Sequence, residues 1–446
     1  MAARPLILFI NPRPFTWYTS AFKSFLTCPP LGILYLAAFL RRSGFSVDVI
    51  DLVADSRSKE EVADFLASRK PGIVGITCTT EGVNSALRMC QFVKEHSPKS
   101  FTVLGGAHPT FDYRAMLENP HVDFVVRYEG ETAMEQLAHE LFTRPRLDLK
   151  EIKGLCWKNN GQVMVNEVPP FVQDLDQLPY PARDLIDLSV YSWPGAILAS
   201  RGCPFKCVFC SAGALSGGQY RYRSAENVFA EMEHMVTDLG VRDFLFVDDT
   251  FTANRKRATR ICEMIIKSHL DITFSCESRV NVVDPDFLAL LKEAGCRLIQ
   301  YGIESGSDEI LKKIRKGITT QQVRDAVMWT YEQGIRIKGS FIIGHLWDTR
   351  ETITKTFDFM QELQEEFGVE AYPALNIPFP GTEQYERRKE LGLKIITDNW
   401  DEYNLGNAII DTPNLSHVEL RNFYFDIGQY ALDTNSLMRE HRMTGE

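Results

Sequence analysis

Apolar residues in the first third of the chain follow two alternating patterns. Short continuous runs, such as residues 5–11, are typical of buried parallel strands, whereas segments such as residues 31–43 repeat apolar positions with helical spacing. Strands that alternate with helices predict a doubly wound parallel sheet, which is a Rossmann-like α/β fold. Such a sheet binds ligands at the carboxyl ends of its strands, where residues 11–30, 77–83 and 105–110 are expected.

The same alternation resumes at residue 196. Six strand-then-helix units follow, and they predict a partial (β/α)6 barrel of the TIM type, whose chemistry lies on the loops after its strands. Before them, Asn159-Asn160-Gly161 predicts a small hairpin, which a stretch rich in Pro and Asp follows. The predicted parts are therefore residues 1–145, a linker with the hairpin at 146–190, the barrel at 191–385 and a short helical region at 386–446.

Composition narrows the class of protein. The net charge of −10, with no basic face, argues against a partner that is a nucleic acid, and no apolar run is long enough to span a bilayer. Ten cysteines without a secretory signal indicate a reducing compartment, so we expect a cytoplasmic protein. Seven of the cysteines are scattered and are expected to be small buried hydrophobes. They are Cys28, Cys78, Cys90, Cys156, Cys262, Cys276 and Cys296.

The other three cysteines form one short motif. In residues 201–210, Cys203, Cys207 and Cys210 are spaced C-x3-C-x2-C. Three thiolates can hold three irons of a four-iron, four-sulfur (4Fe-4S) cluster and leave the fourth iron open for another ligand. A zinc site completed by a distant histidine or part of a disulfide set would also use clustered cysteines, although the next histidine is His234. Apolar neighbours that could shield a cluster from water are Phe205, Val208 and Phe209.

The motif and its context, residues 199–211, closely resemble the radical S-adenosylmethionine superfamily. The resemblance implies that Cys203, Cys207 and Cys210 ligate the cluster and that S-adenosylmethionine chelates the open iron through its amino and carboxylate groups. An electron from the cluster then cleaves the sulfonium and yields a 5′-deoxyadenosyl radical. The resemblance also implies an external electron donor of the flavodoxin or ferredoxin type.

Further motifs match that family in order along the chain. Asp248 and Asp249 fit a motif that in relatives contacts the amino group of methionine, and one of the two is expected to hold the loop. Arg279 matches an arginine suited to the methionine carboxylate, a pairing that a guanidinium makes well. Glu304 and Ser305 match a motif that can hold the ribose or the methionyl group. Each alone could instead be an ordinary ion pair or cap.

Two segments of the predicted barrel each have two possible roles. Relatives usually carry Gly-Leu/Phe-Pro-Gly at the position where this chain has Gly344-His345-Leu346-Trp347, so a bulky Trp could reshape the pocket or pack outside it. Tyr220 and Tyr222 are candidate catalytic residues that could donate a proton or a hydrogen atom to an intermediate. Roles at the surface or in stacking on adenine are the alternative.

The first region carries a second resemblance, to the cobalamin-binding domain that precedes many radical S-adenosylmethionine domains. The matching segments are residues 29–38, 105–110 and 128–131. Gly105 and Gly106 would let the backbone approach a flat ligand closely. His108 is expected to act as a hydrogen-bond partner and not as a cobalt ligand, and Tyr128 stands where relatives often carry Gly. A domain that kept this fold but lost the cofactor is the alternative.

Together, the resemblances imply an enzyme that uses cobalamin to methylate an unactivated carbon of a small molecule. The deoxyadenosyl radical removes a substrate hydrogen, and the cofactors carry the difficult chemistry. One alternative is a radical cyclase, dehydratase or rearrangement enzyme on the same fold, without methyl transfer and without a need for cobalamin. The other is a non-enzymatic iron–sulfur scaffold, against which the ordered motifs argue.

Overall fold

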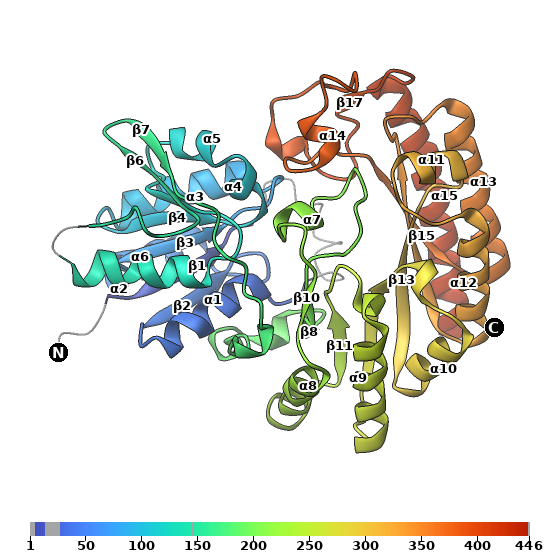
Figure 1. Cartoon of the computed structure of the whole chain (residues 1–446), viewed down its shortest axis with the longest axis horizontal. Helices are drawn as coiled ribbons and strands as arrows, with labels where there is room; N and C mark the ends of the chain where they lie inside the picture. The colour runs from blue at the N-terminus through green and yellow to red at the C-terminus, as the bar shows by residue number, and fades with distance from the viewer. Residues whose placement is uncertain (1–4, 14–26, 145–146, 445–446) are drawn as a thin grey trace. The chain divides into compact units, whose positions relative to one another are not determined.

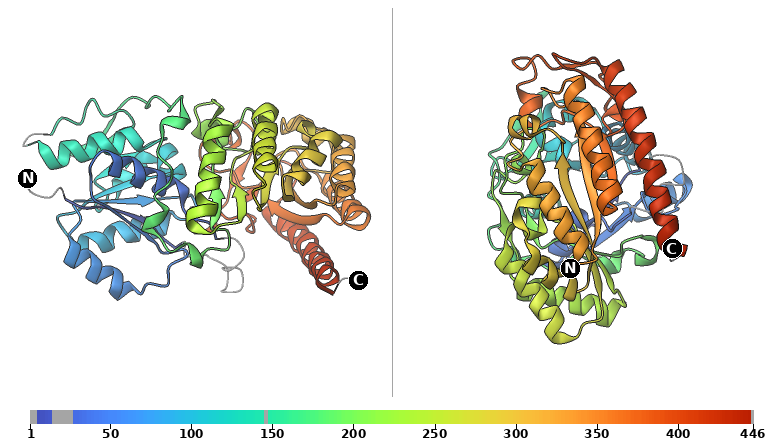
Figure 2. Two further views of the ribbon diagram at one scale, coloured as in Figure 1. Left: turned by 90° about the horizontal axis from the view of Figure 1, so that it is seen from below. Right: turned by 90° about the vertical axis from the view of Figure 1, so that its right-hand side faces the viewer.

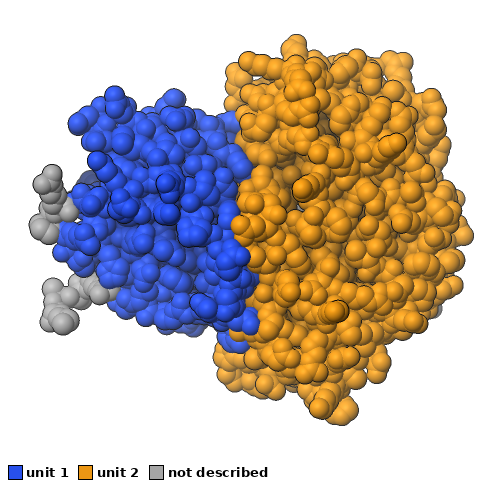
Figure 3. Space-filling view, viewed as in Figure 1, with its two compact units in different colours: residues 1–196, 399–401 blue, residues 197–398, 402–446 orange. Residues whose placement is uncertain are grey.

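The computed structural model describes residues 5–13, 27–144 and 147–444, so part of the predicted loop at 11–30 lies outside the described residues. The chain divides into two compact units (Figure 3). Unit 1 comprises residues 1–196 together with 399–401, and unit 2 comprises residues 197–398 and 402–446.

Unit 1 is built on one seven-stranded sheet with the strand order β2-β1-β3-β4-β5-β6-β7 (Figure 1). Neighbours among β1 to β5 are parallel. The strands are β1 (Ile7–Asn11), β2 (Val47–Asp51), β3 (Ile73–Thr77), β4 (Phe101–Gly105), β5 (Phe124–Val126), β6 (Leu155–Asn159) and β7 (Gln162–Val165). The helices are α1 (Leu31–Arg42), α2 (Lys59–Arg69), α3 (Val83–His96), α4 (Ala107–Phe111), α5 (Tyr113–Glu118) and α6 (Glu131–Thr143).

Two apolar cores show that helices cover both faces of this sheet. One core joins α1 and α6 to side chains such as Ile7 and Phe9, and the other joins α2, α3 and α5 to side chains such as Leu8 and Ile10. Successive residues of β1 thus point to opposite faces, as strand geometry requires, and both sets are buried. This arrangement confirms the predicted doubly wound α/β domain.

The predicted hairpin is present as β6 and β7, but it belongs to the main sheet. β6 pairs antiparallel with β5, placing Cys156 opposite Val125, and β7 pairs antiparallel with β6. The sheet is therefore mixed and not wholly parallel. The hairpin supplies buried apolar side chains at Leu155 and Cys156 and covers the edge that β5 would otherwise expose, which explains why it is recruited.

Unit 2 contains a six-stranded sheet with the order β15-β14-β13-β12-β11-β8. The pairs from β11 to β15 are parallel, which confirms the predicted partial barrel. The strands are β8 (Gly195–Ile197), β11 (Asp243–Phe246), β12 (Thr273–Ser278), β13 (Cys296–Glu304), β14 (Arg336–Ile343) and β15 (Glu370–Leu375). A small antiparallel pair, β9 (Ser200–Arg201) and β10 (Arg221–Tyr222), flanks the three-cysteine motif.

Helices between the strands pack on one face of this sheet (Figure 2). They are α8 (Ala225–Leu239), α9 (Arg255–Ser268), α10 (Pro285–Glu293), α11 (Asp308–Lys313), α12 (Thr320–Glu332) and α13 (Arg350–Phe367), after the short α7 (Ala212–Leu215). Ser224 caps α8 by accepting a hydrogen bond from the Asn227 amide, as its sequence position predicts.

The C-terminal region adds a short helix, α14 (Glu383–Glu386), a two-stranded hairpin of β16 (Lys394–Ile395) and β17 (Ile410–Asp411), and the long α15 (His417–Thr444). α15 packs along the edge strand β15. There the Asn435 side chain donates to the Ala371 carbonyl at 2.8 Å and accepts from the Ala371 amide at 3.1 Å, which satisfies the exposed edge. Among the described residues, no helix is long and apolar enough to cross a membrane.

Candidate functional site

The three-cysteine loop is fixed at its ends and in its middle. Antiparallel pairing of β9 with β10 holds the start, where Gly202 has φ 83° and any side chain would overlap the Gln219 carbonyl. The Val208 amide donates to the Ile314 carbonyl at 3.1 Å, and the Val208 carbonyl accepts from the Gln384 amide at 3.2 Å. Hydrogen bonds of its main chain therefore hold the loop in place, and the thiol side chains stay available to bind a ligand.

The three thiols of this loop are all outside disulfides. Cys203 Sγ lies 3.9 Å from Thr250 Oγ1, and Arg279 Nη1 lies 3.6 Å from Cys207 Sγ. Enclosure by protein atoms raises the pKa of Cys203, and it raises the pKa of Cys210 to about 11 although water reaches part of that residue. Because the thiolate is the metal ligand, iron binding here must release protons.

The chemistry of this donor set fits an iron–sulfur cluster. Within the described residues, no three His, Cys, Asp or Glu side chains meet closely enough to hold a single metal ion. In a four-iron cluster each cysteine ligates a different iron, so the ligands are spread more widely than around one ion. Val208 is buried and Phe205 and Phe209 are half-buried, so apolar side chains border the loop as predicted.

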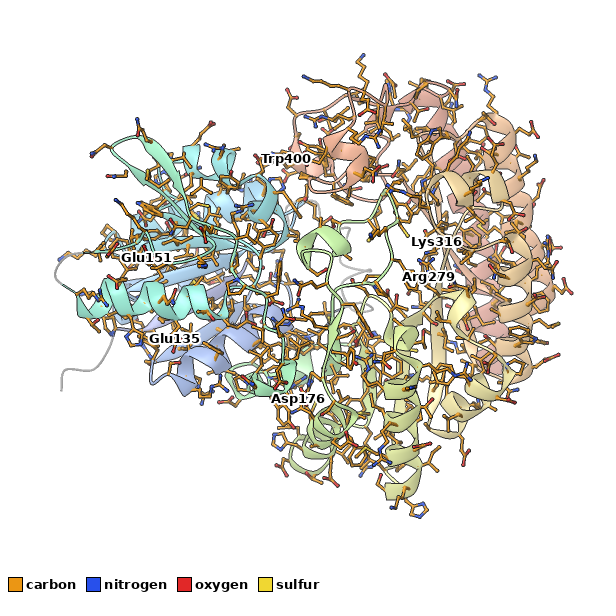
Figure 4. The ribbon with its side chains drawn as sticks, in the orientation of Figure 1. Glu135, Glu151, Asp176, Arg279, Lys316 and Trp400 are labelled. Carbon is orange, nitrogen blue, oxygen red and sulfur yellow. The ribbon has the colours of Figure 1, made fainter. Side chains whose placement is uncertain are left out.

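Arg279 lies directly beside the loop (Figure 4). Its guanidinium carbon is 3.7 Å from the Phe205 ring centroid, and its Nη2 donates to the Lys316 carbonyl. The side chain is buried, so stacking and hydrogen bonding fix its direction. The predicted pairing with a methionine carboxylate stays a prediction, and the position next to Cys207 is one from which that pairing can be made.

The two aspartates after β11 have different surroundings. Asp248 is buried and accepts hydrogen bonds from the Ala199 amide at 3.0 Å and from the Ser200 hydroxyl, with Arg257 3.7 Å away. Asp249 is exposed, and its pKa is raised by partial enclosure and by the charge of Asp248. Asp248 therefore holds the strand end together, and Asp249 is the carboxylate that remains accessible to a ligand.

Glu304 and Ser305, at the end of β13, both have protein partners. Glu304 Oε1 lies 2.6 Å from Lys316 Nζ in an ion pair that is almost fully buried. Ser305 Oγ lies 3.1 Å from Thr356 Oγ1 and accepts from the Ser307 amide. The motif thus places a buried ion pair at the strand end, and the predicted role of these residues in holding the ribose or methionyl group stays a prediction.

Glu277 is a site residue that the motifs did not single out. It is the penultimate residue of β12, and its side chain is reached by water although protein atoms surround it on most sides. Enclosure, together with the charges of Asp249 and Glu304, raises the pKa of Glu277 to about 7. This carboxyl is therefore divided between its protonated and ionised forms near neutral pH.

His345 belongs to the segment in which this chain departs from the family pattern. It is 1% exposed, and its ring centroid is 5.4 Å from that of Phe209 in the cysteine loop. Burial lowers its pKa to about 3, so the ring is neutral at physiological pH, and Nε2 has no hydrogen-bond partner among the described residues. Its amide and that of Gly344 donate to Asp348, which holds the turn.

The remaining residues of this unit lie nearer the surface. Trp347 is half-buried and lines a hollow of about 330 Å³ together with Val208 and Arg315. The Tyr222 side chain is 48% exposed, with the Arg257 guanidinium 5.7 Å from its ring centroid, and Tyr220 packs 5.8 Å from it. The exposed position of Tyr222 fits the surface role, whereas the Tyr220 hydroxyl is buried. A catalytic or stacking role for either tyrosine stays a prediction.

In unit 1, the loops after β3 and β4 form a backbone cradle. Gly106 has φ 107°, and a Cβ there would lie 2.9 Å from the Cys78 carbonyl oxygen, so only glycine fits. Gly105 has ordinary room for a Cβ, with the nearest atom 3.6 Å away. Gly106 is therefore required for the packing of the loop after β4 against the loop after β3, and the predicted approach of the backbone at Gly105 and Gly106 to a flat ligand stays a prediction.

His108 lies beside this cradle and is almost fully buried. Its Nδ1 is 3.3 Å from Thr80 Oγ1, its Nε2 is 3.6 Å from Asp112, and its ring meets Trp400 edge-on at 4.5 Å (Figure 4). These contacts fit the predicted hydrogen-bonding role. Tyr128 has φ 62°, which explains why glycine suits that position, and its amide donates to Thr110 Oγ1 at 2.9 Å.

Comparison with known proteins gives two family matches and several relatives. Residues 21–138 match the B12 binding domain, and residues 197–360 match the radical SAM superfamily. An uncharacterized methyltransferase of Pyrococcus horikoshii is 38% identical over 88% of this chain and 85% of its own length. The anaerobic magnesium-protoporphyrin IX monomethyl ester cyclase of Rubrivivax gelatinosus is 28% identical over 93% of this chain and 75% of its own length.

The fold also matches a solved structure. The radical S-adenosylmethionine methyltransferase TsrM of Kitasatospora setae, with cobalamin and a [4Fe-4S] cluster bound, superposes with a TM-score of 0.73 at 19% identity, covering 95% of this chain and 82% of TsrM. The two family matches fall on the two units whose strand ends carry the glycine cradle and the three-cysteine loop. The chain belongs to the radical S-adenosylmethionine enzymes that carry a B12-binding domain.

Proposed function

We propose that this enzyme transfers a methyl group to an unactivated carbon of a small molecule. The observation that carries the proposal is the Arg279 guanidinium, whose Nη1 lies 3.6 Å from Cys207 Sγ in the loop of three free thiols. The same chain has a second cofactor domain with a backbone cradle at Gly106. When bound, the cluster supplies the electron that cleaves S-adenosylmethionine, and cobalamin carries the methyl group.

The residues of unit 2 bind and orient the methionine end. Cys203, Cys207 and Cys210 ligate the cluster. Arg279 pairs with the methionine carboxylate, since its guanidinium is stacked and can offer a forked donor. Asp249, the accessible carboxylate after β11, accepts from the methionine ammonium.

An electron donor and a location follow from the same chemistry. The reaction needs single electrons, so we propose an external donor of the flavodoxin or ferredoxin type. All ten cysteines are free, and a cluster with an open iron needs a reducing compartment, which supports a cytoplasmic enzyme.

A second candidate function is radical cyclisation on the same fold. It is favoured by three anaerobic magnesium-protoporphyrin IX monomethyl ester cyclases, each 28% identical to this chain. We rank methyl transfer first because the relative that is named a methyltransferase is 38% identical to this chain, compared with 28% for each cyclase.

One experiment separates the two functions. Anaerobically reconstituted enzyme is given a chemical reductant, cobalamin, methyl-labelled S-adenosylmethionine and a metabolite extract. S-adenosylhomocysteine together with 5′-deoxyadenosine supports methyl transfer. Deoxyadenosine without S-adenosylhomocysteine contradicts it and supports the second class, and absence of both products contradicts the radical reaction itself.

A further inference from the structure

The long helix α15 carries apolar side chains on the side that faces solvent. The helix runs along the outside of unit 2 and packs against β15 and α13 (Figure 2). Ile427 and Ala431 lie on the packed side and are buried. On the solvent side, Val418 is 42% exposed, Phe425 70% and Leu432 55%. Single exposed apolar residues are normal on a protein surface, whereas three in a line on one helix require an explanation.

The three exposed residues do form a line. They are spaced by seven, and seven residues make almost two full turns of an α-helix. Such spacing is that of one seam position in a coiled coil, where it marks the line of contact with a second helix. From Val418 to Leu432 the line is about 21 Å long at the helical rise per residue. We call Val418, Phe425 and Leu432 the apolar stripe.

Gly428 lies beside the apolar stripe, one turn after Phe425 and in the interior of the helix. Glycine at such a position weakens a helix relative to alanine. Its own unit gives no reason for it, because a Cβ at Gly428 would meet no other part of the described chain within 4 Å. The missing side chain therefore leaves room for a second helix to approach the backbone next to Phe425.

The apolar stripe is complementary to itself. When a second α15 lies antiparallel with Phe425 against Phe425, Val418 of each copy meets Leu432 of the other. An interface with two-fold symmetry uses the same patch on both copies, so a residue that meets a second one must be met by it in return. Three evenly spaced apolar residues satisfy this condition along the whole line.

The ionisable residues near the apolar stripe favour this antiparallel order. Arg421, Asp426 and Asp433 are exposed. In the antiparallel order they come level, respectively, with Gln429, Tyr424 and His417 of the second copy. A parallel pair would instead bring each of the three level with its own counterpart, and like charges set against each other oppose association.

We infer that the apolar stripe joins two copies of this chain through antiparallel α15 helices. A surface of anionic lipid does not fit the same face, because Arg421 is the only basic residue between 418 and 436 and membrane-binding helices are rich in Lys and Arg. One helix pair is smaller than the roughly 800 Å² that each partner buries in a standard interface, so the dimer dissociates on dilution, with Kd in about the micromolar range. This inference is independent of the proposed function.

The test measures the oligomeric state of the reconstituted holoenzyme. Anaerobic sedimentation velocity at roughly 1 to 100 µM should show monomer at the lowest concentration and dimer at the highest. A protein that stays monomeric over the whole range overturns the inference. The measurement uses no substrate, so its outcome does not depend on which reaction the enzyme catalyses.

Variants assign the dimer to the apolar stripe. Phe425→Glu sets two carboxylates against each other at the symmetry axis, and we expect Kd to rise roughly tenfold or more. Tyr331→Glu changes another aromatic residue, 56% exposed on α12, and should leave Kd unchanged. Iron content and Tm verify that each variant folds, and Leu432→Glu replaces Phe425→Glu if the latter does not. An unchanged Kd in the folded stripe variant overturns the assignment.

A double variant tests the antiparallel order. Val418→Lys and Leu432→Glu, made singly, each place one charge against an apolar side chain in both outer contacts. The double variant pairs Lys with Glu in both contacts of an antiparallel dimer, whereas it would oppose like charges in a parallel one. A Kd below that of either single variant supports the antiparallel order, and any other ranking overturns it.

Discussion

The strand ends of the two units offer different means of binding a ligand. In unit 1, the loops after β3 and β4 offer backbone shape: Gly106 in a left-handed conformation against the Cys78 carbonyl, with one buried histidine beside it. In unit 2, the strand ends carry ionisable groups, among them the Glu304–Lys316 pair and Arg279 beside Cys207.

This difference follows from what each ligand presents. A corrin ring is large and flat, so it needs close approach of the backbone and little charge. S-adenosylmethionine carries a carboxylate, an ammonium and a sulfonium, so its site must hold charges of both signs in low dielectric. We therefore expect a substitution in one unit to weaken binding of that unit's cofactor without affecting the other. Different kinds of substitution should be needed at the two sites.

Cys207→Ala should have the largest effect. Removing one of three thiolates deprives the cluster of a ligand, so we expect deoxyadenosine formation to fall to background and iron content to drop. The absorbance of bound cobalamin should stay unchanged, because unit 1 is intact. Cys262→Ala, a buried cysteine on α9, controls for the loss of a thiol, and persistent deoxyadenosine formation in Cys207→Ala would refute the ligand assignment.

Gly106→Ala tests the predicted cobalamin site of unit 1 and leaves the cysteine loop of unit 2 unchanged. A side chain at φ 107° is strained by roughly 1–2 kcal/mol, and its Cβ would also lie 2.9 Å from the Cys78 carbonyl oxygen. The loop must shift, so we expect cobalamin affinity to fall at least tenfold while iron content is retained. Gly161→Ala, at φ 80° in the turn between β6 and β7 with nothing within 4 Å of its Cβ, is the control in an absorbance titration. Equal affinities in the two variants would show that backbone shape does not govern this site.

Lys316→Met tests the dependence of unit 2 on charge. It leaves the Glu304 carboxylate buried without its cation, and breaking a buried pair in this way costs about 3–5 kcal/mol of folding free energy. Denaturant unfolding of the anaerobic holoenzyme measures the loss. The double variant Glu304→Gln/Lys316→Met removes both charges and should recover most of the stability. A single variant as stable as the double would contradict the argument.

Much of this arrangement could be predicted from sequence because it is local. Strand-then-helix periodicity predicted the parallel strands of both large sheets, and the spacing of Cys203, Cys207 and Cys210 predicted one loop. Relations between distant segments could not be predicted in this way. The hairpin at Asn160 is a local signal, whereas its pairing with β5 depends on which sheet edge is open.

The same limit explains the residues that were missed. Lys316 follows a short helix and shows no motif, and only the fold brings its ammonium to Glu304. His345 was visible as a departure from the usual family pattern, but its burial against Phe209 depends on packing. Seven scattered cysteines were predicted to be buried, and six are, whereas Cys28 is half-exposed near the end of a segment outside the described residues.

Glu277→Gln should have the smallest effect, and it depends on pH. The folded state holds the pKa of Glu277 at about 7, above the ordinary 4.5, so between these values the folded protein keeps a proton that the unfolded chain has lost. The free energy of unfolding therefore declines as pH rises through that interval. The glutamine variant has no carboxyl to titrate at this position, so it should not show this decline. We expect its Tm advantage over the unmodified enzyme to grow from pH 4.5 to 7 and then level off. Glu293→Gln, at the exposed end of α10, is the control, and a constant Tm difference across pH would contradict the shifted ionisation.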